Sequence, residues 1–144
     1  MIAKTIKYTD YNGNEREEKF LFNLTKAELS EMELSFEGGL QTKIQNIIEA
    51  NNNAEIIKML KEIILKSYGE KTEDGKRFRK INQNGEPLSV AFSETEAYSQ
   101  LFMELASNDK AASEFIIGIL PQDMNKDELK KQVEVEQAKL LNNN

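Results

Sequence analysis

The sequence predicts an α+β fold in which an N-terminal β-hairpin packs on a bundle of about five helices. Near the N-terminus, alternating apolar and polar residues flank an Asn-Gly pair, a pattern typical of a hairpin. Over most of the remaining chain, apolar residues recur at intervals of three and four, a pattern typical of helices that bury one face. The 144 residues include 39% hydrophobic residues, 31% charged residues and two prolines, which suits one soluble, helix-rich domain.

The predicted hairpin occupies the first 23 residues or so. Ile6 and Tyr8 alternate with polar residues in its first strand, and Phe22 belongs to an apolar run that ends its second strand. Asn12-Gly13 accepts the positive φ angles of a tight turn between antiparallel strands. An isolated hairpin is only marginally stable. One or two short strands from residues 77–92 are therefore candidates to extend the sheet, over residues 77–81 and residues 88–92.

A capping box predicts the start of the first helix, because Thr25 and Glu28 can satisfy each other's free backbone N–H groups. This helix ends near Phe36, since Gly38-Gly39 disfavours its continuation. Four further apolar stripes predict helices over about 40–50, 56–68, 93–105 and 109–120.

Particular residues mark the ends of these later helices. Gly69 is the expected C-terminal cap of the third helix. A second capping box at Ser93 and Glu96 predicts the start of the fourth, Asn108 is the expected cap of the fifth, and Pro121 marks the end of the fifth. Residues 70–92 are rich in turn-forming residues, which predicts a long irregular connection.

The chain divides into one predicted α+β domain, residues 1–121, and a polar C-terminal tail, residues 122–144. Apolar residues in the tail are scattered among many charges, so we expect an exposed helix or disorder there. No apolar run approaches the roughly 18 residues that span a membrane, and the N-terminus lacks the apolar core of a signal peptide. These features predict a cytoplasmic protein without a membrane partner.

The composition argues against catalysis, because the chain contains no His and no Cys. Their absence excludes His-assisted nucleophiles, zinc fingers, iron–sulfur clusters and His-ligated metal sites. No phosphate-binding glycine motif is present. The acidic residues at 15–18 lack the ligand spacing of a calcium loop and alternate with a basic residue. We therefore expect no catalytic residue, no metal and no cofactor, and the protein is predicted not to be an enzyme.

The charge distribution points to protein partners and away from nucleic acid. The net charge is −6, which repels phosphate backbones. Residues 76–80 form a small basic cluster around Phe78, which is typical of a solvated edge with one buried ring. Residues 93–121 contain five acidic groups and one basic group, so the acidic stretch coincides with the last two predicted helices.

Five segments of the chain together resemble the tail assembly chaperones of long-tailed bacteriophages. They are residues 4–18, 22–29, 37–40, 64–78 and 95–105. The most specific parts are Phe-Asn-Leu-Thr-Lys-Ala-Glu at 22–28 and Ser-Tyr-Gly at 67–69. The resemblance covers roughly residues 1–121 and carries no catalytic residues.

The resemblance implies a phage or prophage protein that acts in the cytoplasm of the infected host. It would bind and solubilise the tape measure protein while tail tube subunits polymerise, and would be absent from the mature virion. The tail tube protein and a second copy of the chain are further candidate partners. Two alternatives remain open: a permanent structural or connector component of a phage tail, and a small inhibitor that binds a host protein.

The helix predicted over residues 93–105 is the candidate partner-binding surface. Its apolar stripe contains Tyr98, Leu101, Phe102 and Leu105 within the acidic part of the chain. Apolar helix faces can enter the groove of a partner. The same stripe can equally close the core of the domain, with Phe102 the better core residue and Tyr98 the better contact residue.

Overall fold

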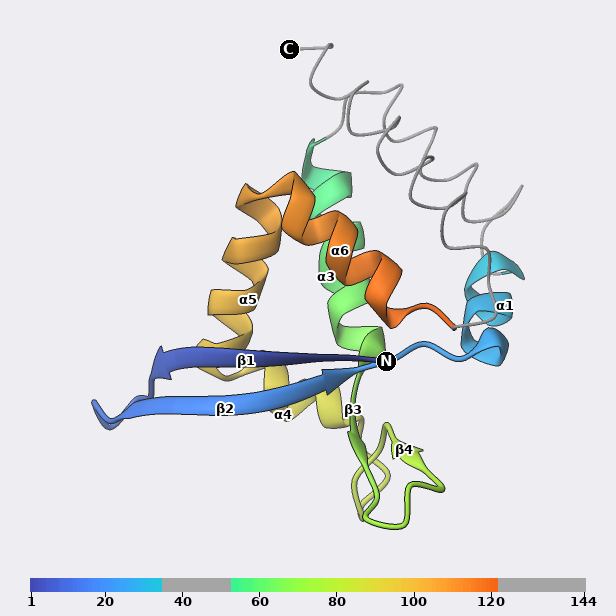
Figure 1. The fold of residues 1–144 in the computed structure, drawn as a ribbon, viewed down its shortest axis with the longest axis horizontal. Coiled ribbons are helices and arrows are strands. Elements are labelled where there is room, and N and C mark those ends of the chain that lie inside the picture. The colour runs from blue at the N-terminus through green and yellow to red at the C-terminus, as the bar shows by residue number, and fades with distance from the viewer. Residues whose placement is uncertain (35–52, 122–144) are drawn as a thin grey trace.

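The computed structural model describes residues 1–34 and 53–121 (Figure 1). The helix predicted over 40–50 and the tail at 122–144 lie outside these residues. Within the described part, four strands form one antiparallel sheet in the order β1-β2-β3-β4, accompanied by five helices. The predicted α+β class and the N-terminal hairpin are confirmed.

The strands are β1 (Ile2–Thr9), β2 (Glu15–Phe22), β3 (Tyr68–Lys71) and β4 (Phe78–Arg79). The helices are α1 (Lys26–Leu34), α3 (Asn53–Ser67), α4 (Leu88–Ser93), α5 (Glu96–Ser107) and α6 (Asp109–Ile119). Figure 1 shows α5 and α6 on one side of the long β1–β2 hairpin, whereas the short β3–β4 hairpin projects from the other side.

The predicted hairpin is confirmed, but its connection is longer than the tight turn predicted from Asn12-Gly13, because residues 10–14 lie between the two strands. The strands pair from Ile2 opposite Phe22 to Thr9 opposite Glu15, and Gly13 has a φ angle of 82°. Asp10 closes the turn, because its Oδ1 accepts hydrogen bonds from the backbone N–H groups of residues 12 and 14, both at 2.9 Å.

Two later turns repeat this arrangement. Asn82 Oδ1 accepts from the N–H groups of Asn84 and Glu86 at 2.9 and 3.0 Å, beside Gly85 at a φ angle of 79°. In the β3–β4 turn, the N–H of Gly75 donates to the carbonyl of Thr72, and the glycine again has a positive φ angle, 74°. A side-chain acceptor or local carbonyl and a glycine thus close each turn within a few residues.

The core lies between the hairpin and helices α3, α5 and α6. One face of the hairpin contributes Ile6 and Phe22, and the ring of Phe22 lies edge-on to the ring of Phe115 with 5.1 Å between centroids. The helices contribute Ile63, Ile64, Leu101, Leu105, Phe115 and Ile119. Alternation in the strands and the three-and-four spacing in the helices therefore direct these side chains to one interior.

Two predicted helix starts are confirmed. Thr25 and Glu28 form the capping box: the Thr25 N–H donates to Glu28 Oε1 at 3.0 Å, and the Glu28 N–H donates to Thr25 Oγ1 at 3.1 Å. The side chain of Asn108 caps α6 by accepting from the N–H of Ala111. Helix α6 ends at Ile119, shortly before the proline, as expected.

The predicted cap at Gly69 is wrong, because α3 ends at Ser67 and Gly69 lies in strand β3 opposite Leu21. The reason for a glycine here is close approach between strands. A Cβ at position 69 would lie 2.6 Å from the carbonyl oxygen of Arg79 and 2.7 Å from the ring of Phe78. Strand β3 therefore extends the sheet from a segment that the sequence analysis assigned to a helix and a connection.

The expectation for residues 77–92 is correct in part. Strand β4 forms at Phe78–Arg79, but the second candidate strand, around residues 88–92, is helix α4. In the sequence, Leu88, Val90 and Phe92 alternate with polar or small residues as in a strand, but Leu88 and Phe92 are also four residues apart as in a helix. The structure selects the helix, in which Phe92 is buried, Leu88 is half-buried and Val90 is exposed. Residues 70–92, predicted to form a long irregular connection, instead contain the end of β3, all of β4 and most of α4.

The second capping box is also misplaced. Ser93 is the last residue of α4, and its hydroxyl donates to the carbonyl of Val90 at 2.6 Å. Helix α5 begins at Glu96, and its N-cap is Thr95, whose Oγ1 accepts from the N–H of Tyr98 at 3.2 Å. Ser and Thr are both favoured at an N-cap, but only Ser93 has a Glu three residues later, so the sequence rule selects Ser93 whereas the end of α4 leaves Thr95 as the cap.

Candidate partner-binding surfaces

Helix α5 carries the four residues that the sequence analysis nominated for partner binding. Leu101 and Leu105 are buried in the core. Tyr98 and Phe102 are half-buried, pack against the same core, and have ring centroids 6.1 Å apart. The ring of Tyr98 also meets Phe92 edge-on at 5.7 Å. The structure thus brings the two aromatics together at the boundary of the core, and partner binding through the stripe stays a prediction.

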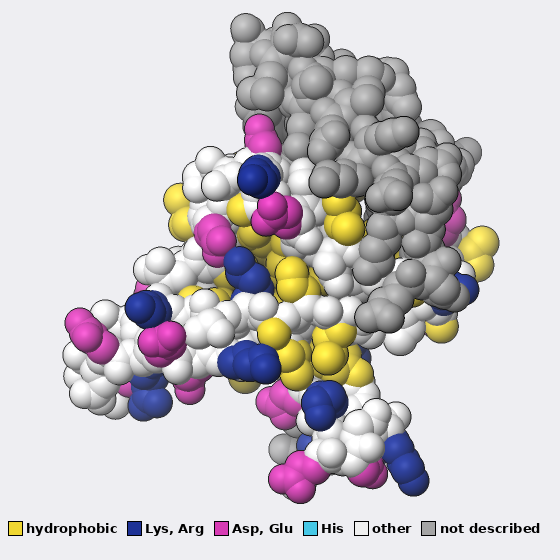
Figure 2. Space-filling view, in the orientation of Figure 1, with side chains coloured by type: hydrophobic (Ala, Val, Ile, Leu, Met, Phe, Trp, Pro, Cys, Tyr) yellow, Lys and Arg dark blue, Asp and Glu magenta, His cyan; other side chains and the backbone are white. Residues whose placement is uncertain are grey.

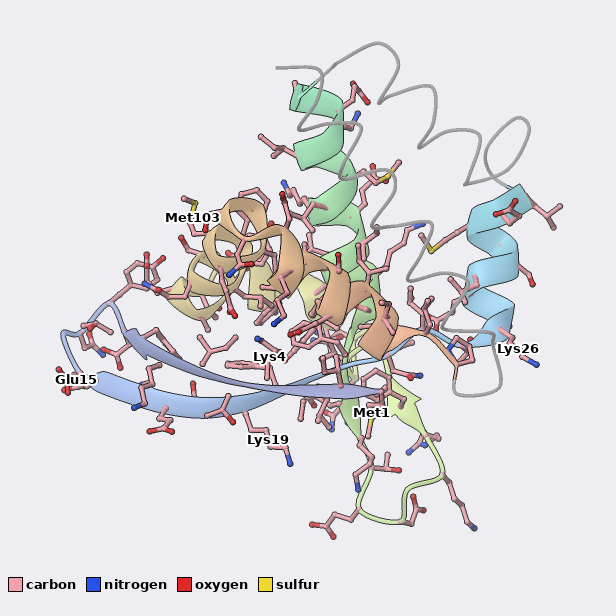
Figure 3. The ribbon with its side chains drawn as sticks, turned by 45° about the horizontal axis from the view of Figure 1, so that its top comes forward. Met1, Lys4, Glu15, Lys19, Lys26 and Met103 are labelled. Carbon is pink, nitrogen blue, oxygen red and sulfur yellow. The ribbon has the colours of Figure 1, made fainter. Side chains whose placement is uncertain are left out.

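The outward side of α5 offers a different apolar residue. Met103 has 59% of its surface exposed, and Figure 3 shows its side chain on the side of α5 that faces away from the hairpin. The neighbouring Glu104 forms an ion pair with Lys4 of β1 at 3.1 Å, which ties this helix to the sheet. Figure 2 shows further hydrophobic side chains at the surface where the hairpin meets the helices.

A groove of about 500 Å³ lies between α1 and the segment that joins β4 to α4. Leu24 and Met32 are buried beneath it, and Leu65 and Tyr68 contribute half-buried side chains. Ile81 lines the groove with 55% of its surface exposed. Pro87, Ser89, Glu28, Glu31, Lys66 and Lys80 complete the lining.

Lys80 ties the two walls of this groove together. Its Nζ donates to the carbonyl oxygens of Asn23 at 2.9 Å and Lys66 at 2.5 Å, and forms an ion pair with Glu28 Oε2 at 3.2 Å. An ammonium group has three donors, so these three acceptors use all of them. Burial lowers the pKa of Lys80, and the nearby Glu28 carboxylate opposes that shift.

The predicted basic cluster at residues 76–80 is therefore not a uniform surface patch. Lys80 is turned toward the interior, with its Nζ 5.2 Å from the centroid of the Phe78 ring. A guanidinium nitrogen of Arg79 lies 3.5 Å from the carbonyl oxygen of Ile81, so its side chain follows its own strand. The Phe78 ring packs over Gly69 and is half-buried, so the predicted buried ring is found only in part.

A family model described as phage tail assembly chaperone matches residues 1–144. The chain belongs to this family. No curated protein and no solved structure matches it. The match confirms the resemblance and extends over the tail, which the resemblance did not cover. Membership implies protein partners in tail assembly inside the host cell and favours a non-enzymatic role for the chaperone.

The side chains of the chaperone suit contact with protein. Among residues 1–34 and 53–121, no group of three or more acidic side chains is arranged to hold a metal ion. In the same ranges, no helix is long and apolar enough to cross a membrane. What the described surface offers is exposed apolar side chains beside single charged groups, which is the composition of protein-binding sites.

Sequence reasoning missed both Met103 and the groove. Met103 lies two positions from Leu101 and Leu105, off the apolar stripe, and a large apolar residue on the polar side of a helix was the available signal. The groove combines residues from four distant segments, and Ile81 lies in a stretch without periodicity. Only the tertiary structure brings these residues together.

Proposed function

We propose that this chaperone binds the tape measure protein and keeps it soluble while tail tube subunits polymerise around it. It then leaves the assembly, so it is absent from the mature virion. Its site of action is the cytoplasm of the infected bacterial host. The observation that carries the proposal is the family match over the whole chain.

The surface of the chaperone gives physical support. Ile81 and Met103 each keep more than half of their surface exposed in the folded chain. A long helical partner with apolar stripes aggregates when it is bare, and small apolar contacts can cover such stripes. Many copies along one chain bind strongly in total even when each contact is weak, and weak contacts allow release.

Helix α5 is our proposed contact element for the tape measure protein. Tyr98 and Phe102 would make contact through their exposed edges, while Leu101 and Leu105 hold the helix in place from the core. Aromatic side chains with one wet edge are common at protein interfaces because they contribute large contact area at small entropic cost.

Co-expression tests the solubilising role. The tape measure protein is expressed alone and together with the chaperone, and its soluble fraction is measured by centrifugation and affinity purification. We expect the tape measure protein to be soluble and to co-purify only when the chaperone is present. Equal amounts in the pellet with and without the chaperone would reject this mechanism.

Mass spectrometry separates the proposal from its two alternatives. We expect the chaperone in lysates of infected cells and not in purified virions. Stoichiometric amounts in mature tails would instead identify a permanent structural or connector component. A one-to-one complex with a host protein, in the absence of any tape measure complex, would identify an inhibitor.

A further inference from the structure

We propose that the groove between α1 and residues 80–89 binds an amphipathic segment of the partner in which a large apolar side chain is followed or preceded by Lys or Arg. This inference rests on the proposed function, because it takes the tape measure protein as the source of that segment. It adds a second partner contact, on a surface separate from the α5 stripe.

The apolar part of the groove accepts the apolar side chain. Its volume of about 500 Å³ lies in the range of pockets that enclose a ligand. Leu24 and Met32 form a buried base, whereas Ile81 remains 55% exposed at the wall. A side chain that enters the groove therefore covers apolar surface of Ile81 that now faces water, and this burial favours binding.

The acidic side chains of the groove favour a Lys or Arg next to the apolar residue of the partner. Glu28 and Glu31 lie three residues apart and therefore on one side of α1. Glu28 is already paired with Lys80. The carboxylate of Glu31 is exposed and forms no ion pair or hydrogen bond with the residues that the structure describes. With a net charge of −6 on the chain, Glu31 provides a carboxylate for a Lys or Arg of the partner.

The groove is formed before a partner arrives. Lys80 fixes one wall to the start of α1 and the end of α3 through its three acceptors. The same wall, residues 80–89, is closed on itself by a backbone bridge between Ile81 and Pro87. A preformed groove lowers the entropic cost of binding, because the site does not have to be ordered when the partner binds.

The test uses two groove variants, each with a matched control. Ile81→Ser removes the exposed apolar wall, and Val90→Ser removes an apolar side chain of similar exposure, 50%, outside the groove. Glu31→Lys reverses the free carboxylate, and Glu62→Lys makes the same change at an exposed position on α3. Thermal melts of the full chain confirm that all four variants fold.

Binding is measured against overlapping 20-residue peptides that cover the tape measure protein of the same phage. We expect the peptides that bind the wild-type chaperone to contain an apolar residue beside Lys or Arg. Ile81→Ser should weaken their binding about tenfold. Glu31→Lys should weaken it about two- to fivefold at low salt and reduce its salt dependence. Both control variants should bind like the wild type.

Each failure has a separate meaning. Unchanged binding of the peptides to both groove variants overturns the groove and leaves the proposed function in place. A groove variant that lowers the melting temperature without weakening binding also overturns it, because the groove is then filled by the chain itself. If neither the peptides nor the intact tape measure protein binds the wild type, the proposed function fails and this inference fails with it.

Discussion

The rings of Tyr68 and Phe92 lie stacked, with their centroids 4.2 Å apart and their planes 10° apart. Tyr68 is the first residue of β3 and Phe92 belongs to α4, so this pair joins the third strand to the short helix. Phe92 also approaches Phe20 at 5.2 Å and Phe22 at 5.8 Å. One helix of six residues is thus held to the sheet largely by a single ring.

Phe92→Ala should be among the most destabilising single substitutions in the chaperone. The ring is buried and has four aromatic neighbours, and deleting a buried Phe costs about 3–5 kcal/mol. Urea unfolding measures this loss. Val90→Ala on the same helix is the control, and its effect should stay below about 1 kcal/mol because Val90 is exposed. Similar losses for both variants would contradict the packing described.

Gly69→Ala should destabilise the sheet although alanine usually favours ordered structure. The added methyl group would lie 2.6 Å from the carbonyl oxygen of Arg79, which is backbone and cannot turn away. We expect a loss of about 1–3 kcal/mol, typical of overpacking. Gly85→Ala serves as a comparison, because its Cβ would meet no atom within 4 Å and its cost would come from the positive φ angle alone. A stabilised Gly69→Ala variant would show that β3 and β4 are not in contact as described.

The capping box at α1 predicts a graded series. Thr25→Ala removes the acceptor for the Glu28 N–H and should cost about 1 kcal/mol in unfolding free energy. Thr25→Ser keeps the hydroxyl and should remain close to wild type. Unfolding free energies from urea denaturation measure the series, and a loss in the Ser variant equal to that in the Ala variant would show that the methyl group, not the hydrogen bond, matters.

Stability should fall in acid partly because of Asp10. Its hydrogen bond with Arg16, together with the backbone N–H groups of Asn14 and Asn12, lowers the pKa of Asp10 below its ordinary value in the folded chain. The unfolded chain therefore binds more protons in the acid range, so the stabilisation is complete above about pH 4 and is lost as the pH falls through the folded pKa.

Asp10→Asn should remove this contribution. The difference in unfolding free energy between wild type and variant should be largest near pH 7 and should shrink toward pH 2. Glu15→Gln is the control, since the Glu15 side chain is exposed beside the same turn and its carboxylate accepts no hydrogen bond from the described residues. A difference that is constant with pH would assign the effect of Asp10 to turn geometry instead of ionisation.

Tyr98 and Phe102 allow stability and partner binding to be separated. Both rings are half-buried, so each alanine variant should lose about 2 kcal/mol, less than the ~3–5 kcal/mol of a fully buried aromatic. Tyr98→Phe keeps the ring and should melt like the wild type. Tyr98→Phe removes only the hydroxyl group at the solvent-exposed edge of the ring. If α5 contacts the tape measure protein through this edge, Tyr98→Phe should weaken co-purification. Unchanged co-purification would restrict Tyr98 to a structural role.

The sequence was sufficient for features whose chemistry is local. Asn12-Gly13, Thr25 with Glu28, and Asn108 each act within four residues, and all three were found. Errors arose where distant contacts decide. Gly69 follows a helical stripe and so fits the sequence pattern of a helix cap, but the nearby Arg79 carbonyl, which the sequence does not reveal, is the reason for a glycine there. Residues 88–92 are too few for periodicity to distinguish a strand from a helix.

The candidate sites show the same division. The α5 stripe was recognisable because its spacing is regular, but its spacing could not say that Leu101 and Leu105 are buried while Tyr98 keeps an exposed edge. The groove had no signal in the sequence, since Leu24, Leu65 and Ile81 are far apart along the chain. The walls of the groove are held together by Lys80, which the sequence pattern assigns to the surface. Only the structure shows that its ammonium group has three acceptors within the fold.

The repeated turn chemistry has a consequence for how the chain is made. Because Asp10 and Gly13 close the first turn locally, the β1–β2 hairpin can pair in its native register as soon as it leaves the ribosome. The covering of its apolar face, however, is complete only when α6 is made, because Phe115 of α6 meets Phe22. About 90 residues separate these partners, so at roughly 5–20 residues per second the face stays incompletely covered for about 5–20 s. This tail assembly chaperone thus passes through an interval during synthesis in which apolar surface of its own is exposed.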